Sequence, residues 1–121
     1  MALLFTYGTL MVGEVAHHRL AGQRFIGPAV TQPGYRLYRM SSWYPAMVID
    51  EASKGRVAGE IYAIDSSLWP SLDAYEDCPA VYRRLEVRLD GGPRPVLTYV
   101  VPQAVMGGAP LIESGSWRAR K

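Results

Sequence analysis

Residues 57–79 read VAGEIYAIDSSLWPSLDAYEDCP, an apolar strand pattern followed directly by a helix pattern. The first part, residues 57–64, is strongly apolar with one charge, Glu60, and predicts a β-strand. Glu60 either points outward or is a buried carboxylate. We favour an outward or arginine-paired side chain, because an unpaired buried charge is costly.

The helix pattern begins at Ser67, whose side chain can cap a helix. Pro70 then takes the third helical position, where its missing N–H would be unpaired in any case. Pro79 disfavours helical geometry in the residue before it, so the helix cannot run past Cys78. Glu76 therefore lies in the last turn, beside an apolar stripe formed by Leu68, Leu72 and Tyr75 with Trp69 next to them.

Short strand candidates flank this segment and are separated by glycine, proline and serine turns. A weaker helix candidate, residues 14–20, is bracketed by Gly13 and Gly22. Together they predict an α+β fold, a compact mixed β-barrel of about six or seven strands with two flanking helices, since closure hides the strand edges. The other strand candidates are residues 3–7, 24–31, 35–39, 46–50, 82–89 and 95–101.

Length and composition favour one domain over residues 1–121, with 49% hydrophobic residues to build its core. The single cysteine, Cys78, excludes an intrachain disulfide. The N-terminal apolar run is too short for a signal peptide or a membrane span, so we expect a cytoplasmic protein with no membrane partner.

Charge is distributed unevenly along the chain. Residues 118–121 form a basic tail with three positive charges, from Arg118, Arg120 and Lys121. Residues 1–117 hold ten basic and eleven acidic side chains, a net charge of −1. A nucleic-acid partner is therefore not expected, although small barrels often bind one.

Three carboxylates, Asp73, Glu76 and Asp77, lie near the end of the predicted helix, where the helix dipole disfavours negative charge. Any of them that is also desolvated by the apolar stripe would have the raised proton affinity that a general acid/base needs. Alternatively, they face water or pair with Arg83 and Arg84.

The segment Tyr7-Gly8-Thr9-Leu10 follows the first predicted strand. Gly8 lets the backbone approach a ligand closely and point successive N–H groups into a concavity that can hold a carboxylate. The alternative is an ordinary turn at the end of a strand.

No metal or other cofactor is expected. On a helix, His17 and His18 would point about 100° apart, so they cannot hold one metal together. Cys78 has acidic and proline neighbours that discourage a nucleophilic thiolate. Trp43 and Tyr44 either wall a pocket or pack in the core.

Five motifs, taken in order, resemble the gamma-glutamylcyclotransferase-like superfamily, and above all its small branch with the gamma-glutamylamine cyclotransferases. The resemblance covers residues 3–101 and implies a mixed β-barrel flanked by helices. It also implies that Glu76 is the catalytic acid/base. The motifs are Tyr7-Gly8-Thr9-Leu10, Tyr44-Pro45-Ala46, Gly59-Glu60-Ile61-Tyr62, Leu72-Asp73-Ala74-Tyr75-Glu76 and Tyr82-Arg83-Arg84.

The same resemblance implies that residues 7–10 grip the glutamyl head of a substrate. Tyr82 and Arg84 match a Tyr-x-Arg motif whose members touch the ligand or hold the pocket. The loop lacks the asparagine that follows glycine and serine in some other branches. This departure argues against glutathione-specific or free-dipeptide activity.

The implied reaction is cofactor-free intramolecular acyl transfer in a small gamma-glutamyl compound. The glutamyl α-amine attacks the γ-amide, and 5-oxoproline and an amine are released. The alternative is a non-enzymatic protein that binds a small molecule on the same barrel. Such a protein has no need of Glu76.

Overall fold

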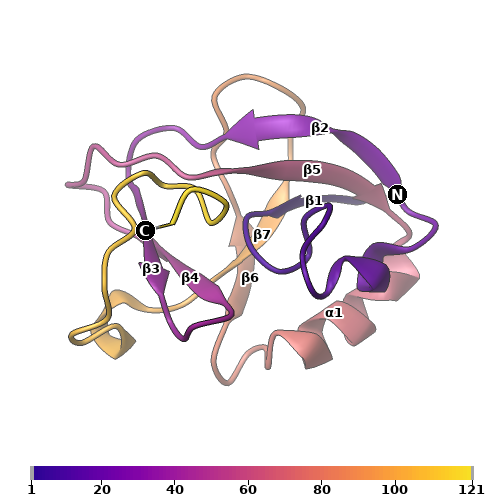
Figure 1. Cartoon of the computed structure of the whole chain (residues 1–121). Helices are drawn as coiled ribbons and strands as arrows, with labels where there is room; N and C mark the ends of the chain where they lie inside the picture. The colour runs from indigo at the N-terminus through magenta and orange to yellow at the C-terminus, as the bar shows by residue number, and fades with distance from the viewer. Residues whose placement is uncertain (1, 121) are drawn as a thin grey trace.

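A five-stranded mixed sheet and a separate two-stranded sheet form the framework of the protein (Figure 1). The computed structural model describes residues 2–120. The strands are β1 (Ala2–Thr6), β2 (Arg24–Val30), β3 (Tyr35–Arg39), β4 (Pro45–Ile49), β5 (Ala58–Ile64), β6 (Arg83–Glu86) and β7 (Leu97–Val100).

The larger sheet has the order β2-β5-β1-β7-β6, and the smaller one pairs β3 with β4. Strand β1 is antiparallel to β5 and parallel to β7, so the sheet is mixed. The predicted strands are therefore present, with ends that differ from the expected ones by at most three residues.

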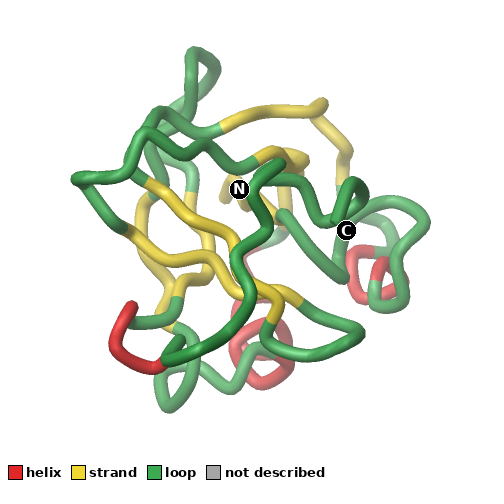
Figure 2. The backbone as a smooth tube through the Cα atoms, turned by 60° about the vertical axis from the view of Figure 1, so that its left-hand side comes forward, coloured by secondary structure: helices red, strands yellow, loops and turns green. Residues whose placement is uncertain are grey.

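The pairing of these strands does not form the closed barrel that we predicted. Strands β2 and β6 are the edges of the larger sheet, and among residues 2–120 an isolated bridge from Thr31 to Leu89 lies just beyond their ends. Strands β6 and β7 have four residues each and pair with each other over their whole length, which leaves the other side of β6 without a strand partner among residues 2–120. Loops and turns make up much of the backbone around the strands (Figure 2).

The predicted helix at residues 67–78 is present as α1 (Trp69–Tyr75), which continues from a 3-10 turn, η2 (Ser66–Leu68). The cap is Asp65, not Ser67, because the Asp65 carboxylate accepts the Ser67 N–H at 2.9 Å. Pro70 is consequently the second residue of α1. The chain leaves the helix at Asp77, whose left-handed backbone (φ 56°) suits aspartate better than most residues.

The prediction of a second flanking helix at residues 14–20 is wrong. Only a 3-10 turn, η1 (His17–Leu20), forms there, and turns precede it. The Ala16 N–H bonds to the Thr9 carbonyl at 2.9 Å, outside any helical pattern. Val15 is 68% exposed, so the segment has no continuous apolar stripe to pack.

Each face of the larger sheet carries part of the apolar core. In β1, Leu4 and Phe5 point to opposite sides and belong to separate apolar clusters. Trp117 is 1% exposed and packs in the cluster of Phe5, so the C-terminal segment contributes this residue to the core. Within residues 2–120, no helix has the length and apolar character needed to cross a membrane.

Candidate active site

A cavity of about 240 Å³ lies where the end of β1, the start of β4 and the C-terminal end of α1 come together. The loop after β1 supplies Tyr7, Gly8 and Thr9 to its wall. Glu76 and Tyr82 line it from the segment after α1. Three regions that are distant in sequence thus surround one space.

Glu76 is the residue directly after α1, and its N–H bonds to the Leu72 carbonyl at 2.9 Å. Burial raises the pKa of its carboxyl group to about 7. No lysine, arginine or histidine lines the cavity within the described chain to oppose this rise. At neutral pH both protonation states of Glu76 are therefore populated, as a group that both accepts and returns a proton requires.

Two tyrosines tie the walls of the cavity to the backbone. The Tyr7 hydroxyl donates to the Tyr99 carbonyl at 2.7 Å and accepts from the Met47 N–H at 3.1 Å. The Tyr82 hydroxyl donates to the Pro45 carbonyl at 2.8 Å. Burial raises the pKa of both phenols, with a further contribution from the charge of Glu76, so both stay neutral.

The loop after β1 packs closely against β4 and α1. A Cβ on Gly8 would lie 2.7 Å from Cγ of Pro45, so this position requires glycine for close approach. Thr9 Oγ1 lies 2.8 Å from the Tyr75 hydroxyl, which links the loop to α1. The backbone N–H groups of Gly8 and Thr9 have no hydrogen-bond acceptor among residues 2–120.

Comparison with known families identifies this arrangement. The model of the family described as "Gamma-glutamyl cyclotransferase, AIG2-like" matches residues 4–119. The chain belongs to this family. The resemblance that the sequence motifs indicated is therefore confirmed.

Similar proteins with cyclotransferase names support the family assignment. The chain is 35% identical over 118 residues to a Vibrio cholerae protein named "Putative gamma-glutamylcyclotransferase", covering 98% of this chain and 96% of the relative. It is 34% identical over 99 residues to human gamma-glutamylaminecyclotransferase, covering 74% of this chain but 62% of the human protein. The chain thus spans less than two thirds of the human relative. The family match itself makes this protein a member of an enzyme family.

A solved structure shares the fold. The AIG2-like protein of Mus musculus superposes with a TM-score of 0.70 at 27% identity, covering 84% of this chain and 77% of the mouse chain. The mixed α+β fold of the cyclotransferase family is therefore present here with one α-helix among the described residues.

The structure brings together most of the residues that the sequence assigned to the site. Tyr7, Gly8, Thr9, Glu76 and Tyr82 all line the cavity. Their roles in catalysis and binding remain predictions. The three carboxylates near the end of α1 have separate surroundings: Asp73 pairs with Arg84, Asp77 is exposed, and burial raises the pKa of Glu76.

Two assigned residues lie outside the lining. Leu10 is 1% exposed and packs in an apolar cluster. Arg84 Nη1 lies 3.0 Å from both carboxylate oxygens of Asp73, the pairing that sequence reasoning had left as an alternative. Its guanidinium also lies 4.4 Å from the centre of the Trp69 ring. Arg84 thus contacts α1 rather than the cavity.

The cavity lining extends beyond the residues that the sequence assigned to the site. Trp43 and Tyr44, left between wall and core, both line the cavity, with ring centres 4.6 Å apart. Tyr75 was placed in the apolar stripe, yet it also reaches the cavity. Tyr99 comes from β7, and its only signal would have been that it is the one aromatic residue of that strand.

Proposed function

We propose that this family member is a gamma-glutamylamine cyclotransferase. The substrate's α-amine attacks its own γ-carbonyl carbon, a new C–N bond closes the lactam, and the original amide C–N bond breaks. The products are 5-oxoproline and a free amine. The observation that carries this proposal is Glu76, a cavity carboxyl group whose pKa is about 7.

Glu76 would remove the proton from the attacking amine and return it to the leaving nitrogen, so the proton count balances within one turnover. The nucleophile is already tethered to the electrophile. The protein therefore needs only to fold the substrate into a reactive shape and to move one proton.

The loop after β1 is the proposed grip for the glutamyl head. The N–H groups of Gly8 and Thr9 lack acceptors among residues 2–120, although both residues are buried. Buried donors without partners are rare, and a substrate carboxylate would satisfy them. Tyr7 and Tyr82 would hold the walls, since their hydroxyl groups already donate to backbone carbonyls.

We further propose that the chain acts as one domain in the cytoplasm. Cys78 is a free thiol, which suits a reducing compartment. Fractionation of the native host with detection of the chain would test the location.

Matched substrates test the reaction directly. A gamma-glutamyl amide, its N-acetyl derivative and a β-aspartyl amide of the same amine are incubated with the protein, and products are identified by mass spectrometry. We expect 5-oxoproline from the first compound alone, because acetylation removes the nucleophile and β-aspartyl attack would form a four-membered ring. Release of free glutamate, or turnover of the capped amide, would indicate hydrolysis by water instead. Binding without turnover across a broad panel of amides would favour a non-enzymatic binding protein.

A further inference from the structure

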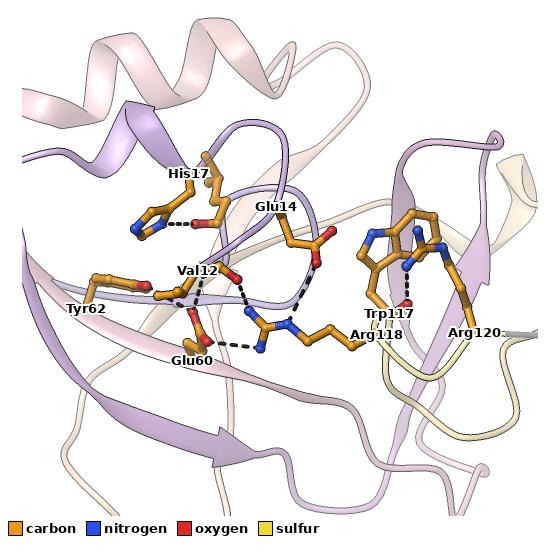
Figure 3. Close-up of polar contacts among 9 residues, drawn as sticks. Val12, Glu14, His17, Glu60, Tyr62, Trp117, Arg118 and Arg120 are labelled. Carbon is orange, nitrogen blue, oxygen red and sulfur yellow. Dashed lines mark hydrogen bonds and ion pairs between the residues drawn. The ribbon is translucent and has the colours of Figure 1, made fainter.

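Arg118 contacts the loop after β1, part of which lines the cavity (Figure 3). The sequence predicts that Arg118 lies in a basic tail. Its Nη1 lies 3.1 Å from Oε2 of Glu60, and its Nη2 donates to the Val12 carbonyl. Its Nε lies 3.7 Å from a carboxylate oxygen of Glu14. One guanidinium thus joins three partners in two separate parts of the chain.

Glu60 completes this contact from β5, an interior strand of the larger sheet. Its side chain is 8% exposed, and Oε1 accepts the Val12 N–H at 3.0 Å and the Tyr62 hydroxyl at 2.9 Å. A charge buried to this degree needs a partner, and Arg118 supplies it. Both backbone groups of Val12 are therefore held, the N–H by Glu60 and the carbonyl by Arg118.

Val12 lies three residues beyond Thr9, and backbone hydrogen bonds of the residues around it tie the loop to Gly8 and Thr9 in the cavity wall. The Met11 N–H donates to the Gly8 carbonyl at 3.1 Å, and the Ala16 N–H donates to the Thr9 carbonyl at 2.9 Å. These bonds close a compact loop over residues 8–16. Holding Val12 in place consequently restricts the orientation of the Gly8 and Thr9 peptide groups.

We propose that Arg118 is a positioning residue for the active site. Together with Glu60 it anchors Val12 and keeps the N–H groups of Gly8 and Thr9 directed at the ligand's carboxylate. That the ligand is a gamma-glutamyl amide rests on the proposed function, whereas the anchoring of the loop does not. Lysine cannot replace arginine here, because a single ammonium lacks the planar fork that reaches Glu60 and the Val12 carbonyl together.

Arg120 provides a matched control. It carries the same charge two residues later, but its guanidinium lies 3.9 Å from the centre of the Trp117 ring and its Nη1 donates to the Trp117 carbonyl. Both of these contacts are with Trp117 rather than with the loop after β1. Arg118→Gln and Arg120→Gln therefore make the same chemical change. Only Arg118→Gln also removes the contacts with Glu60 and Val12.

The experiment compares wild type, Arg118→Gln, Arg118→Lys and Arg120→Gln in the full chain. We expect Arg118→Gln to raise KM for a gamma-glutamyl amide about tenfold, the loss equivalent to one charge-assisted hydrogen bond. The pH dependence of the rate should not move, because Glu76 stands on another element. In Arg118→Lys, log KM should return less than half of the way to the wild-type value. Arg120→Gln should have the KM of wild type. A KM for Arg118→Gln equal to that of Arg120→Gln would overturn the proposal.

Backbone amide exchange provides a second readout that needs no turnover. We expect the hydrogen-bonded amides of Met11, Val12 and Ala16 to exchange at least tenfold faster in Arg118→Gln than in Arg120→Gln, with β1 unchanged. If wild type turns over no gamma-glutamyl amide, the proposed function fails while this exchange measurement still decides the anchor. Equal exchange in the two variants would refute it. Should Arg118→Gln fail to fold, the same comparison is made with Arg118→Lys.

Discussion

At the scale of single residues, the surroundings of Glu76 decide its chemistry. Asp73 accepts from Arg84 and from the Tyr99 hydroxyl, which lies 2.6 Å away, and Asp77 is exposed. Glu76 alone combines burial at the cavity wall with the absence of a basic residue in the described lining. Burial without a compensating charge is what favours its protonated form.

We predict that Glu76→Gln folds normally and loses turnover by about 10²–10⁴-fold, the usual share of general acid/base catalysis. Glutamine has nearly the same shape as glutamic acid but cannot carry the proton. Release of 5-oxoproline and the melting temperature are measured together, with Glu113→Gln, an exposed glutamate, as control. Wild-type activity in Glu76→Gln would show that the carboxyl group takes no part in the chemistry.

The same carboxyl group makes stability depend on pH. Its native pKa is about 7 against an ordinary value of 4.5, so between these values the native state binds more protons than the unfolded state. The free energy of unfolding contributed by Glu76 is therefore fully present below about pH 4.5 and is lost as the pH rises towards 7. We predict that the melting temperature of Glu76→Gln, relative to wild type, rises from pH 5 to pH 8. A difference that is constant over this range would contradict the buried environment.

At the scale of elements, the cavity depends on the contact between the loop after β1 and strand β4. Gly8 and Pro45 meet at a distance that leaves no room for a side chain on Gly8. The Tyr7 hydroxyl strengthens the same junction by bridging β7 and β4. The position of the loop is thus set by packing against β4.

We predict that Gly8→Ala weakens binding of 5-oxoproline, measured by calorimetry, and lowers the melting temperature. The new Cβ would overlap Pro45 and push the loop away from β4. Gly108→Ala is the control, because a Cβ there meets nothing within 4 Å. Unchanged affinity in Gly8→Ala would show that the loop does not grip the ligand.

At the scale of the whole molecule, the charge around the cavity bears on the leaving amine. The charged side chains in the described lining are Glu76 and Asp77, both acidic, and the aromatic rings of Trp43 and Tyr44 lie with them. Such a wall attracts cations and repels carboxylates. The positive charge of Arg118 pairs with Glu60 and does not line the cavity.

We predict that gamma-glutamyl derivatives of diamines turn over faster than gamma-glutamyl α-amino acids, whose leaving group carries a carboxylate beside the amide. A carboxylate near Asp77 costs electrostatic energy. The difference in turnover between the two kinds of substrate should therefore shrink as salt is added. The measurement is kcat/KM for a cationic, a neutral and an anionic amide at low and high ionic strength. Faster turnover of the anionic amide would contradict this preference.

The sequence alone determined the features that depend on local patterns. Short apolar runs between glycine and proline turns predicted the strands, because these residues interrupt a ladder wherever they occur. Pro79 limited the helix to the residues before it, which placed Glu76 near the C-terminal end of α1. The five ordered motifs indicated the family, which the match over residues 4–119 confirms.

Tertiary structure alone decided the features that depend on contacts between distant residues. Strand counts do not say which strands pair, so an open sheet of five strands and a separate pair replaced the predicted barrel. Arg84 faces Asp73 rather than the cavity, and Arg118 reaches Glu60 across 58 positions of sequence. Charge pairing of this kind depends on where the backbone brings side chains in space, and no local pattern encodes that position.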